Sequence, residues 1–177
     1  MKRSLFFALL FFTLGVQGQK FISESSKVTF FSKASVQDIA ANNSKSTSTF
    51  NTATSEIEFM VPIKEFTFEK SLMQKHFNEK YIESEKYPKS TFQGKILDFQ
   101  PQKSGPQLAR AVGKFTVHGV TKDIDVPGTV EFVNGRIIMK SKFKVKLVDY
   151  KIEIPQLLWR NVTEEVEVSV DFTYKPN

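Results

Sequence analysis

Apolar and polar residues alternate along most of the chain, which is the pattern of β-strands with one buried face. In the clearest run, charged or hydroxyl residues alternate with Val166, Val168, Val170, Phe172 and Tyr174. The same period predicts strands at residues 57–63, 109–117, 124–132 and 137–147, and shorter ones at 28–35, 65–68 and 91–99. Asn134-Gly135, between two of these runs, predicts a tight hairpin. We therefore expect seven or eight antiparallel strands.

Residues 69–84 depart from this period, because their apolar side chains recur at helical spacing and predict one amphipathic helix. These side chains are Leu72, Met73, Phe77 and Tyr81, with His76 beside them. A second short helical or irregular piece is expected at residues 154–161. The polar stretch NNSKSTST, residues 42–49, is expected to form a loop.

The one-sided strands must bury their apolar faces, which requires either a closed barrel or two sheets packed as a sandwich. Periodicity alone does not separate these two folds. Three consecutive inward positions of one strand are small, namely Ala109, Ala111 and Gly113. An eight-stranded barrel can use such space to hold one small ligand. We therefore predict an all-β closed antiparallel barrel of about eight strands, with the helix covering one end.

The first 18 residues have the order of a secretory signal peptide: a basic start, an apolar run and small residues before a cleavage site. Cleavage is expected near Gly18–Gln19, which leaves residues 19–177 as one domain. The chain has no cysteine, so neither a disulfide nor a lipid-modified cysteine is expected. These features predict a periplasmic or secreted protein that is stabilised by packing alone.

Lysines occupy every second position from Lys140 to Lys146, which places them on one face of a strand. That face carries no aromatic side chains, which single-stranded nucleic-acid sites use as stacking platforms. The whole chain has a net charge of +6, and removal of Lys2 and Arg3 with the signal peptide reduces it to +4. We interpret the row as a solvated outer face and expect no nucleic-acid partner. Weak docking on anionic membrane headgroups is the alternative.

The chain offers little for catalysis or metal binding. Its two histidines, His76 and His118, belong to a predicted helix and a predicted turn, whereas a zinc site needs three or four protein ligands. No Gly-x-Ser-x-Gly nucleophile motif is present, and acidic pairs such as Glu165 and Glu167 point outward from a strand. We predict no enzyme activity, no catalytic residue, no metal and no cofactor.

Two stretches, YIESEKYPKSTFQG (residues 81–94) and GKFTVHGVTKDIDVP (residues 113–127), resemble the YceI-like lipid- and polyisoprenoid-binding family. The order of motifs continues through KFKVKLVDYKIEIP and VEVSVDF, so the resemblance covers nearly all of residues 21–174. It implies an exported, lipocalin-like barrel that encloses a long isoprenoid or a similar amphiphile. It implies no catalytic residue.

On this interpretation the protein is an exported lipid-binding protein, a monomer or dimer, that sequesters or carries an isoprenoid, quinone-like or fatty chain in its lumen. The expected lumen residues are Phe30, Phe59, Phe66, Phe68, Phe92, Ala111, Phe115, Val117, Ile124, Val126, Met139, Phe143, Val145, Val168 and Val170, in a wider inward set with Ile57, Ile96, Phe132 and Phe172. The expected mouth residues are Met73, His76, Phe77, Tyr81, Tyr150 and Trp159, with Lys122 and Arg160 as further headgroup donors. The alternative is a β-sandwich with a solid core that recognises glycan or protein through its loops.

Overall fold

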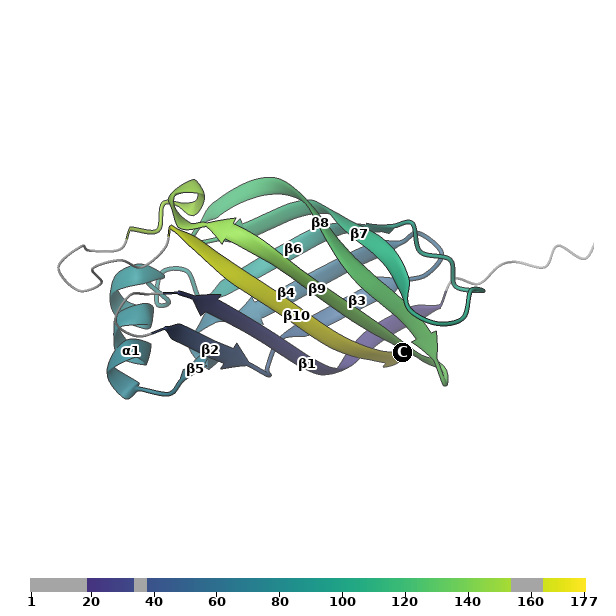
Figure 1. Cartoon of the computed structure of the whole chain (residues 1–177), viewed down its shortest axis with the longest axis horizontal. Coiled ribbons are helices and arrows are strands. Elements are labelled where there is room, and N and C mark those ends of the chain that lie inside the picture. The colour runs from purple at the N-terminus through teal and green to yellow at the C-terminus, as the bar shows by residue number, and fades with distance from the viewer. Residues whose placement is uncertain (1–18, 34–37, 154–163) are drawn as a thin grey trace, which may run out of the picture.

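A closed antiparallel barrel contains most of the residues that the structure, a computed structural model, describes: 19–33, 38–153 and 164–177 (Figure 1). Its strands are β1 (Lys20–Ser32), β2 (Ile39–Asn43), β3 (Thr47–Asn51), β4 (Glu56–Pro62), β5 (Thr67–Phe68), β6 (Lys89–Leu97), β7 (Gln107–Val117), β8 (Val120–Val133), β9 (Arg136–Lys146) and β10 (Glu165–Pro176). The helical pieces are η1 (Ile63–Glu65), α1 (Ser71–His76), η2 (Phe77–Tyr81) and η3 (Leu147–Tyr150). Among the described residues, no helix has the length and apolar character needed to cross a membrane.

The barrel closes because the first strand pairs with the last. Consecutive strands pair as antiparallel neighbours from β6 to β10, and β10 then pairs with β1 along nearly its whole length, for example Val28 with Val170. The predicted barrel is confirmed, and the alternative of two packed sheets is wrong, because this last pairing leaves the sheet no free edge at β1 or β10.

The ten strands fill eight positions around the barrel, because two neighbouring positions are each occupied by two short strands instead of one long strand. β2 and β3 lie end to end along β1, and β4 and β5 lie end to end beside them. The prediction of a polar loop at residues 42–49 is therefore wrong. Both ends of this stretch belong to β-strands, and only residues 44–46 lie between β2 and β3.

Asn43 bridges these two positions. Its buried side-chain amide donates to the Pro62 carbonyl at 2.7 Å, and its Oδ1 accepts from the Lys45 backbone N–H at 2.8 Å and from Ser46 Oγ at 3.0 Å. Burial of a polar group costs free energy unless the group is hydrogen-bonded. Because these hydrogen bonds satisfy Asn43, polar residues whose sequence predicted a loop can belong to the barrel wall.

We expect Asn43→Ala to lower the free energy of unfolding by about 2–3 kcal/mol, because it leaves the Pro62 carbonyl and two hydrogen-bond donors without their partner. Urea denaturation measures this change. The exposed neighbour Asn42 provides the matched control, and Asn42→Ala should stay within about 0.5 kcal/mol of the wild type. Equal losses in both variants would contradict the bridging role.

Two hairpins have the same two-residue turn. His118-Gly119 joins β7 to β8, and Asn134-Gly135 joins β8 to β9, with φ between 50° and 74° at all four residues. Such left-handed pairs match the twist of the flanking strands, so both predicted turns are confirmed.

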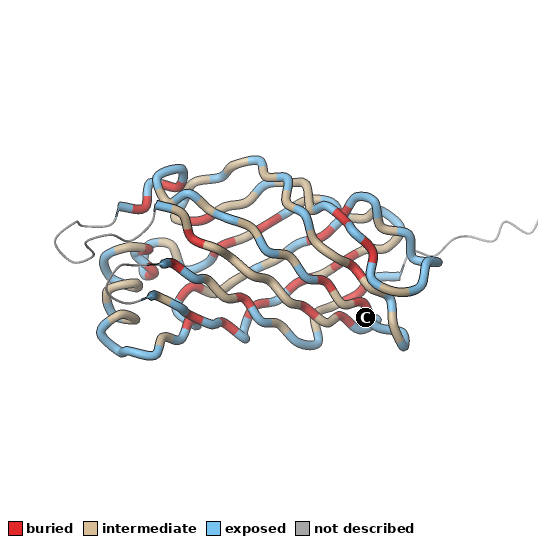
Figure 2. Tube along the Cα trace, in the orientation of Figure 1, coloured by how far each residue is buried: buried red, intermediate tan, exposed pale blue. Residues whose placement is uncertain are grey.

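One end of the barrel is packed solid. Phe21, Phe50, Ile57, Ile137 and Tyr174 are each at most 1% exposed, and they lie beside the β3–β4 turn, beside the β8–β9 hairpin and where β1 meets the end of β10. Figure 2 shows buried positions recurring along the strands of the barrel. Tyr174 forms a 2.8 Å hydrogen bond with Ser48 Oγ, which donates its own hydrogen to the Glu58 carbonyl at 2.7 Å. The Tyr174 hydroxyl must therefore be the donor.

Burial raises the pKa of Tyr174 above its ordinary value. Stability from the neutral phenol is complete below the unfolded pKa of about 10 and falls as the pH rises above it. We therefore expect urea midpoints to decline from pH 9 upward, and Tyr174→Phe to decline less steeply. Parallel curves for wild type and Tyr174→Phe would contradict this assignment.

Candidate functional site

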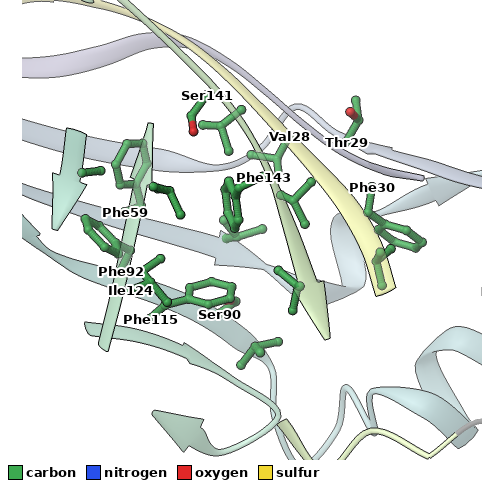
Figure 3. A pocket seen from close by; sticks show the side chains of 18 of the residues that line it. Val28, Thr29, Phe30, Phe59, Ser90, Phe92, Phe115, Ile124, Ser141 and Phe143 are labelled. Carbon is green, nitrogen blue, oxygen red and sulfur yellow. The ribbon is translucent and has the colours of Figure 1, made fainter. Parts of the chain in front are cut away.

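A cavity occupies the half of the barrel next to α1. The space open to the centre of a water-sized sphere is about 270 Å³, and the wall is almost entirely apolar. Figure 3 shows the rings of Phe59, Phe92, Phe115 and Phe143 turned toward this space from different strands. These rings come from β4, β6, β7 and β9, so the two-residue period of each strand places them inside.

The structure places every predicted lumen residue on the cavity wall. These are Phe30, Phe59, Phe66, Phe68, Phe92, Ala111, Phe115, Val117, Ile124, Val126, Met139, Phe143, Val145, Val168 and Val170. Ile96 and Phe172 of the wider set also line it. Ile57 is buried in the solid end instead, and Phe132 is 39% exposed and packs edge-on against Phe21, with ring centroids 6.4 Å apart. Whether the wall residues contact a ligand stays a prediction.

The three small residues predicted to point inward from β7 have two different roles. Ala109 and Ala111 line the cavity, as their size suggested. Gly113 does not, because it faces Gly94 of β6, and a Cβ on Gly113 would lie 2.3 Å from the Gln93 carbonyl oxygen and 2.5 Å from Gly94 Cα. Gly113 therefore permits close approach of two backbones, and the interpretation of it as lumen space is wrong.

A cluster of four phenylalanines fills part of the end of the cavity at α1. The Phe30 ring lies 5.3–5.6 Å, between centroids, from those of Phe66, Phe68 and Phe77. Phe66 lies between η1 and β5, Phe68 ends β5, and Phe77 begins η2. These segments therefore pack their rings into the barrel. The predicted helix is confirmed as a continuous segment, α-helical in α1 and π-helical in η2, and it covers this end as expected.

Only some of the residues predicted at the mouth of the cavity line it. Met73, Phe77 and Tyr81 line the cavity, whereas the half-buried His76 does not. Tyr150 is also outside the cavity, although its ring centroid lies 5.5 Å from that of Phe115. Trp159, Arg160 and the helical piece expected at residues 154–161 fall in the undescribed stretch 154–163. Burial raises the pKa of Tyr81 to about 12, so its hydroxyl stays neutral at physiological pH.

His118 ties the β7–β8 turn to its surroundings. Its Nδ1–H donates to the Tyr150 carbonyl at 3.0 Å, and its Nε2 lies 3.1 Å from Glu83 Oε2. Lys122 of β8 reaches Asp149 of η3 at 2.9 Å. These contacts hold η3 beside the start of β8, and His118 acts as a structural turn residue.

The lysine row lies on the outer face and is paired with acidic residues of β10. Lys140 contacts Asp171 at 3.1 Å, Lys142 contacts Glu167 at 2.7 Å, and Lys144 contacts Glu165 at 3.4 Å. Acidic partners at this spacing leave no continuous cationic stripe for a polyanion. Within the described ranges, no three histidine or acidic side chains gather as a metal site.

Several wall residues were not predicted, namely Val28, Val61, Ile63, Ile82, Leu147 and Ile152. Val28, Val61, Ile63 and Leu147 continue the alternation of predicted strands, so that signal was sufficient to find them. Ile82 and Ile152 lie between strands, where no period indicates which way a side chain points.

Comparisons with known proteins agree with this geometry. A family model described as the YceI-like domain matches residues 20–174. A polyisoprenoid binding domain from Saccharophagus degradans, implicated in plant cell wall breakdown, superposes with a TM-score of 0.77 at 15% identity, over 89% of this chain and 98% of that one. BcnA from Burkholderia cenocepacia gives 0.70 at 18%, over 84% and 95%. The Campylobacter jejuni YCEI protein gives 0.52 at 18%, over 67% and 71%. No curated protein sequence matched.

Proposed function

The chain belongs to the YceI-like family, and from this premise we propose that it binds an amphiphile whose long apolar tail lies in the barrel cavity. The observation that carries the proposal is the apolar cavity itself, built from rings and branched side chains of nearly every long strand. The name of the Saccharophagus degradans domain supports a polyisoprenoid as the class of tail. Binding means sequestration of the tail from water, without chemical change.

The energetics suit such a tail. Each buried methylene contributes about 0.8 kcal/mol, so about fifteen contribute about 12 kcal/mol. Association costs at least about 4 kcal/mol, which leaves an affinity in the micromolar range. The inward-facing Ser90 hydroxyl already donates to the Thr116 carbonyl, and few other polar groups face the cavity. A charged headgroup would lose its hydration there without replacement, so it must stay outside.

A fluorescent apolar probe tests the proposal. We expect the lipid-stripped protein to bind it with a stoichiometry of one, and an isoprenoid alcohol to displace it. Binding of glycan or protein without any uptake of the probe would overturn the proposal.

The same ligand should stabilise the fold, because only the folded barrel has the cavity. At a free concentration of about 100 times Kd the stabilisation is about 2.7 kcal/mol, which raises the melting temperature by roughly 5–10 °C for a domain of this size. Calorimetry of stripped and reloaded protein measures this shift. Identical melting curves would contradict tail burial.

We further propose that the protein is exported. The barrel begins at Lys20, so cleavage near Gly18–Gln19 would remove none of its strands. N-terminal sequencing of protein recovered outside the cytoplasm should start close to Gln19. Peripheral contact with anionic membranes, as a monomer or dimer, is a weaker proposal because the outer lysines are already paired. If it occurs, raised salt should release the protein from vesicles while retaining its bound lipid.

A further inference from the structure

β8 and β9 pair along only part of their lengths. Their ladder runs from Val133–Arg136 at the hairpin to Gly128–Ser141 and then ends. Beyond this point residues 120–127 pair only with β7, and residues 142–146 pair only with β10. Figure 1 shows β8 arching away from β9 toward the end that carries α1. We call the space between these two unpaired edges the lateral slit.

The sequence explains where the ladder stops. In an antiparallel strand the N–H and C=O of one residue point to the same side. The Pro127 carbonyl accepts a hydrogen bond from Ser141 Oγ of β9 at 2.7 Å, so the Pro127 nitrogen also faces β9 and has no hydrogen to donate. At Gly128 the strands still touch, because a Cβ there would lie 2.6 Å from the Lys140 carbonyl oxygen. Proline and glycine thus fix the foot of the slit.

The slit has apolar edges that belong to the cavity wall. Ile124 and Val126 of β8 and Phe143 and Val145 of β9 all line the cavity, and all four are only half-buried. In a closed ladder these inward side chains would be covered on both sides by neighbouring strands. At about 3.3 Å per residue the unpaired edges are roughly 15–25 Å long, several times the width of a hydrocarbon chain.

Side chains fill much of both ends of the barrel. The four-phenylalanine cluster fills the end at α1 on the side of β1, β5 and η2, and the packing around Phe21, Phe50 and Tyr174 fills the opposite end. The foot of the slit also opens outward, because Pro127, Thr129 and Lys140 border both the cavity and a shallow groove on the outer face. The slit is therefore one route by which the described part of the wall connects the cavity to solvent.

We propose that the apolar tail enters and leaves the barrel sideways through the lateral slit, while the polar head stays outside between its two rims. This inference rests on the proposed function. Asp123 and Asp125 form one rim and Lys142 and Lys144 the other, so an ionic or hydrogen-bonding headgroup would meet partners of either charge.

The charged side chains of both rims pair with the strands outside the slit and not with each other. Asp125 pairs with Arg110 and Asp123 with Lys114, both on β7, while Lys142 and Lys144 pair with β10. If the register of the ladder continued, Asp125 would face Lys144. Exposed ion pairs contribute little, so exchange of partners across the slit allows it to narrow around a bound tail at small cost.

A covalent staple across the slit tests the proposal, and the absence of native cysteines makes the chemistry specific. Asp125→Cys with Lys144→Cys is joined by bis-maleimides of increasing length, because separated edges cannot form a disulfide. The matched control joins Glu131→Cys with Ile138→Cys, which face each other in the closed part of the same seam. Stopped-flow fluorescence follows uptake and release of the apolar probe.

We expect the slit staple to slow both uptake into stripped protein and release from loaded protein by about tenfold or more, because it blocks a gating motion. The control staple should change neither rate. Rates in the stapled protein equal to those of the same double-cysteine variant before stapling would overturn the lateral route, and faster uptake in Phe77→Ala would then indicate the end at α1. Failure of the unstapled variant and of wild type to bind the probe would instead overturn the proposed function.

Discussion

Ala111→Trp should weaken lipid binding by about 100-fold while leaving the barrel folded. Ala111 points into the cavity from the middle of β7, and an indole there occupies the space of several tail methylenes. Excluding about four methylenes costs about 3 kcal/mol, which weakens Kd by about 100-fold. Probe titration measures Kd, and circular dichroism checks the fold.

The neighbouring outward position supplies the control. Val112 pairs with Lys95 and Asp125 on either side, and Val112→Trp adds the same ring to the outer face of the same strand. It should bind the probe as the wild type does. If Ala111→Trp keeps wild-type affinity, the ligand does not occupy this cavity.

Gly113→Ala should destabilise the barrel by about 3 kcal/mol or more, because the added methyl meets backbone that cannot rotate away. Gly113 and Gly94 face each other across β6 and β7, and each Cβ would lie 2.3 Å from a carbonyl oxygen of the opposite strand. Gly94→Ala should therefore cost a similar amount. Urea denaturation measures both losses.

Gly105→Ala is the matched control, because no atom lies within 4 Å of the added methyl. Its left-handed φ of 80° alone should cost about 1–2 kcal/mol. A loss at Gly113 no larger than at Gly105 would show that β6 and β7 do not approach so closely.

The alternation of residues was sufficient to predict the barrel wall. In each long strand the side-chain period is two, so one correctly placed aromatic such as Phe115 or Phe143 also fixes its neighbours two positions away. The choice between barrel and sandwich was not available from periodicity, because both folds bury one face of each strand. It depends on the pairing of β1 with β10, which joins opposite ends of the chain.

The misses have a common cause, since each depends on contacts between distant segments. Asn43 and Ser48 are polar residues that read as loop but are buried because their partners, Pro62 and Tyr174, lie on other strands. Gly113 suggested empty space but faces Gly94. The four-phenylalanine cluster likewise unites three separate segments, so the partly filled end at α1 could not be read from any one of them.

The sequence contains part of the signal for the lateral slit. Pro127-Gly128 inside a long alternating run is an unusual pair for a central strand, since proline cannot donate to a ladder. The sequence did not show which neighbour the Pro127 nitrogen faces. The hydrogen bond from Ser141 supplies that direction and turns a local irregularity into an opening.

Native mass spectrometry of the purified wild-type protein beside Ala111→Trp tests the hollow barrel most directly. The wild type should carry one additional mass of a prenyl or fatty-chain lipid, released only by collisional activation, and the variant should carry none. Wild-type protein that is always free of lipid, and that takes up none when it is offered, would contradict a tail-binding cavity.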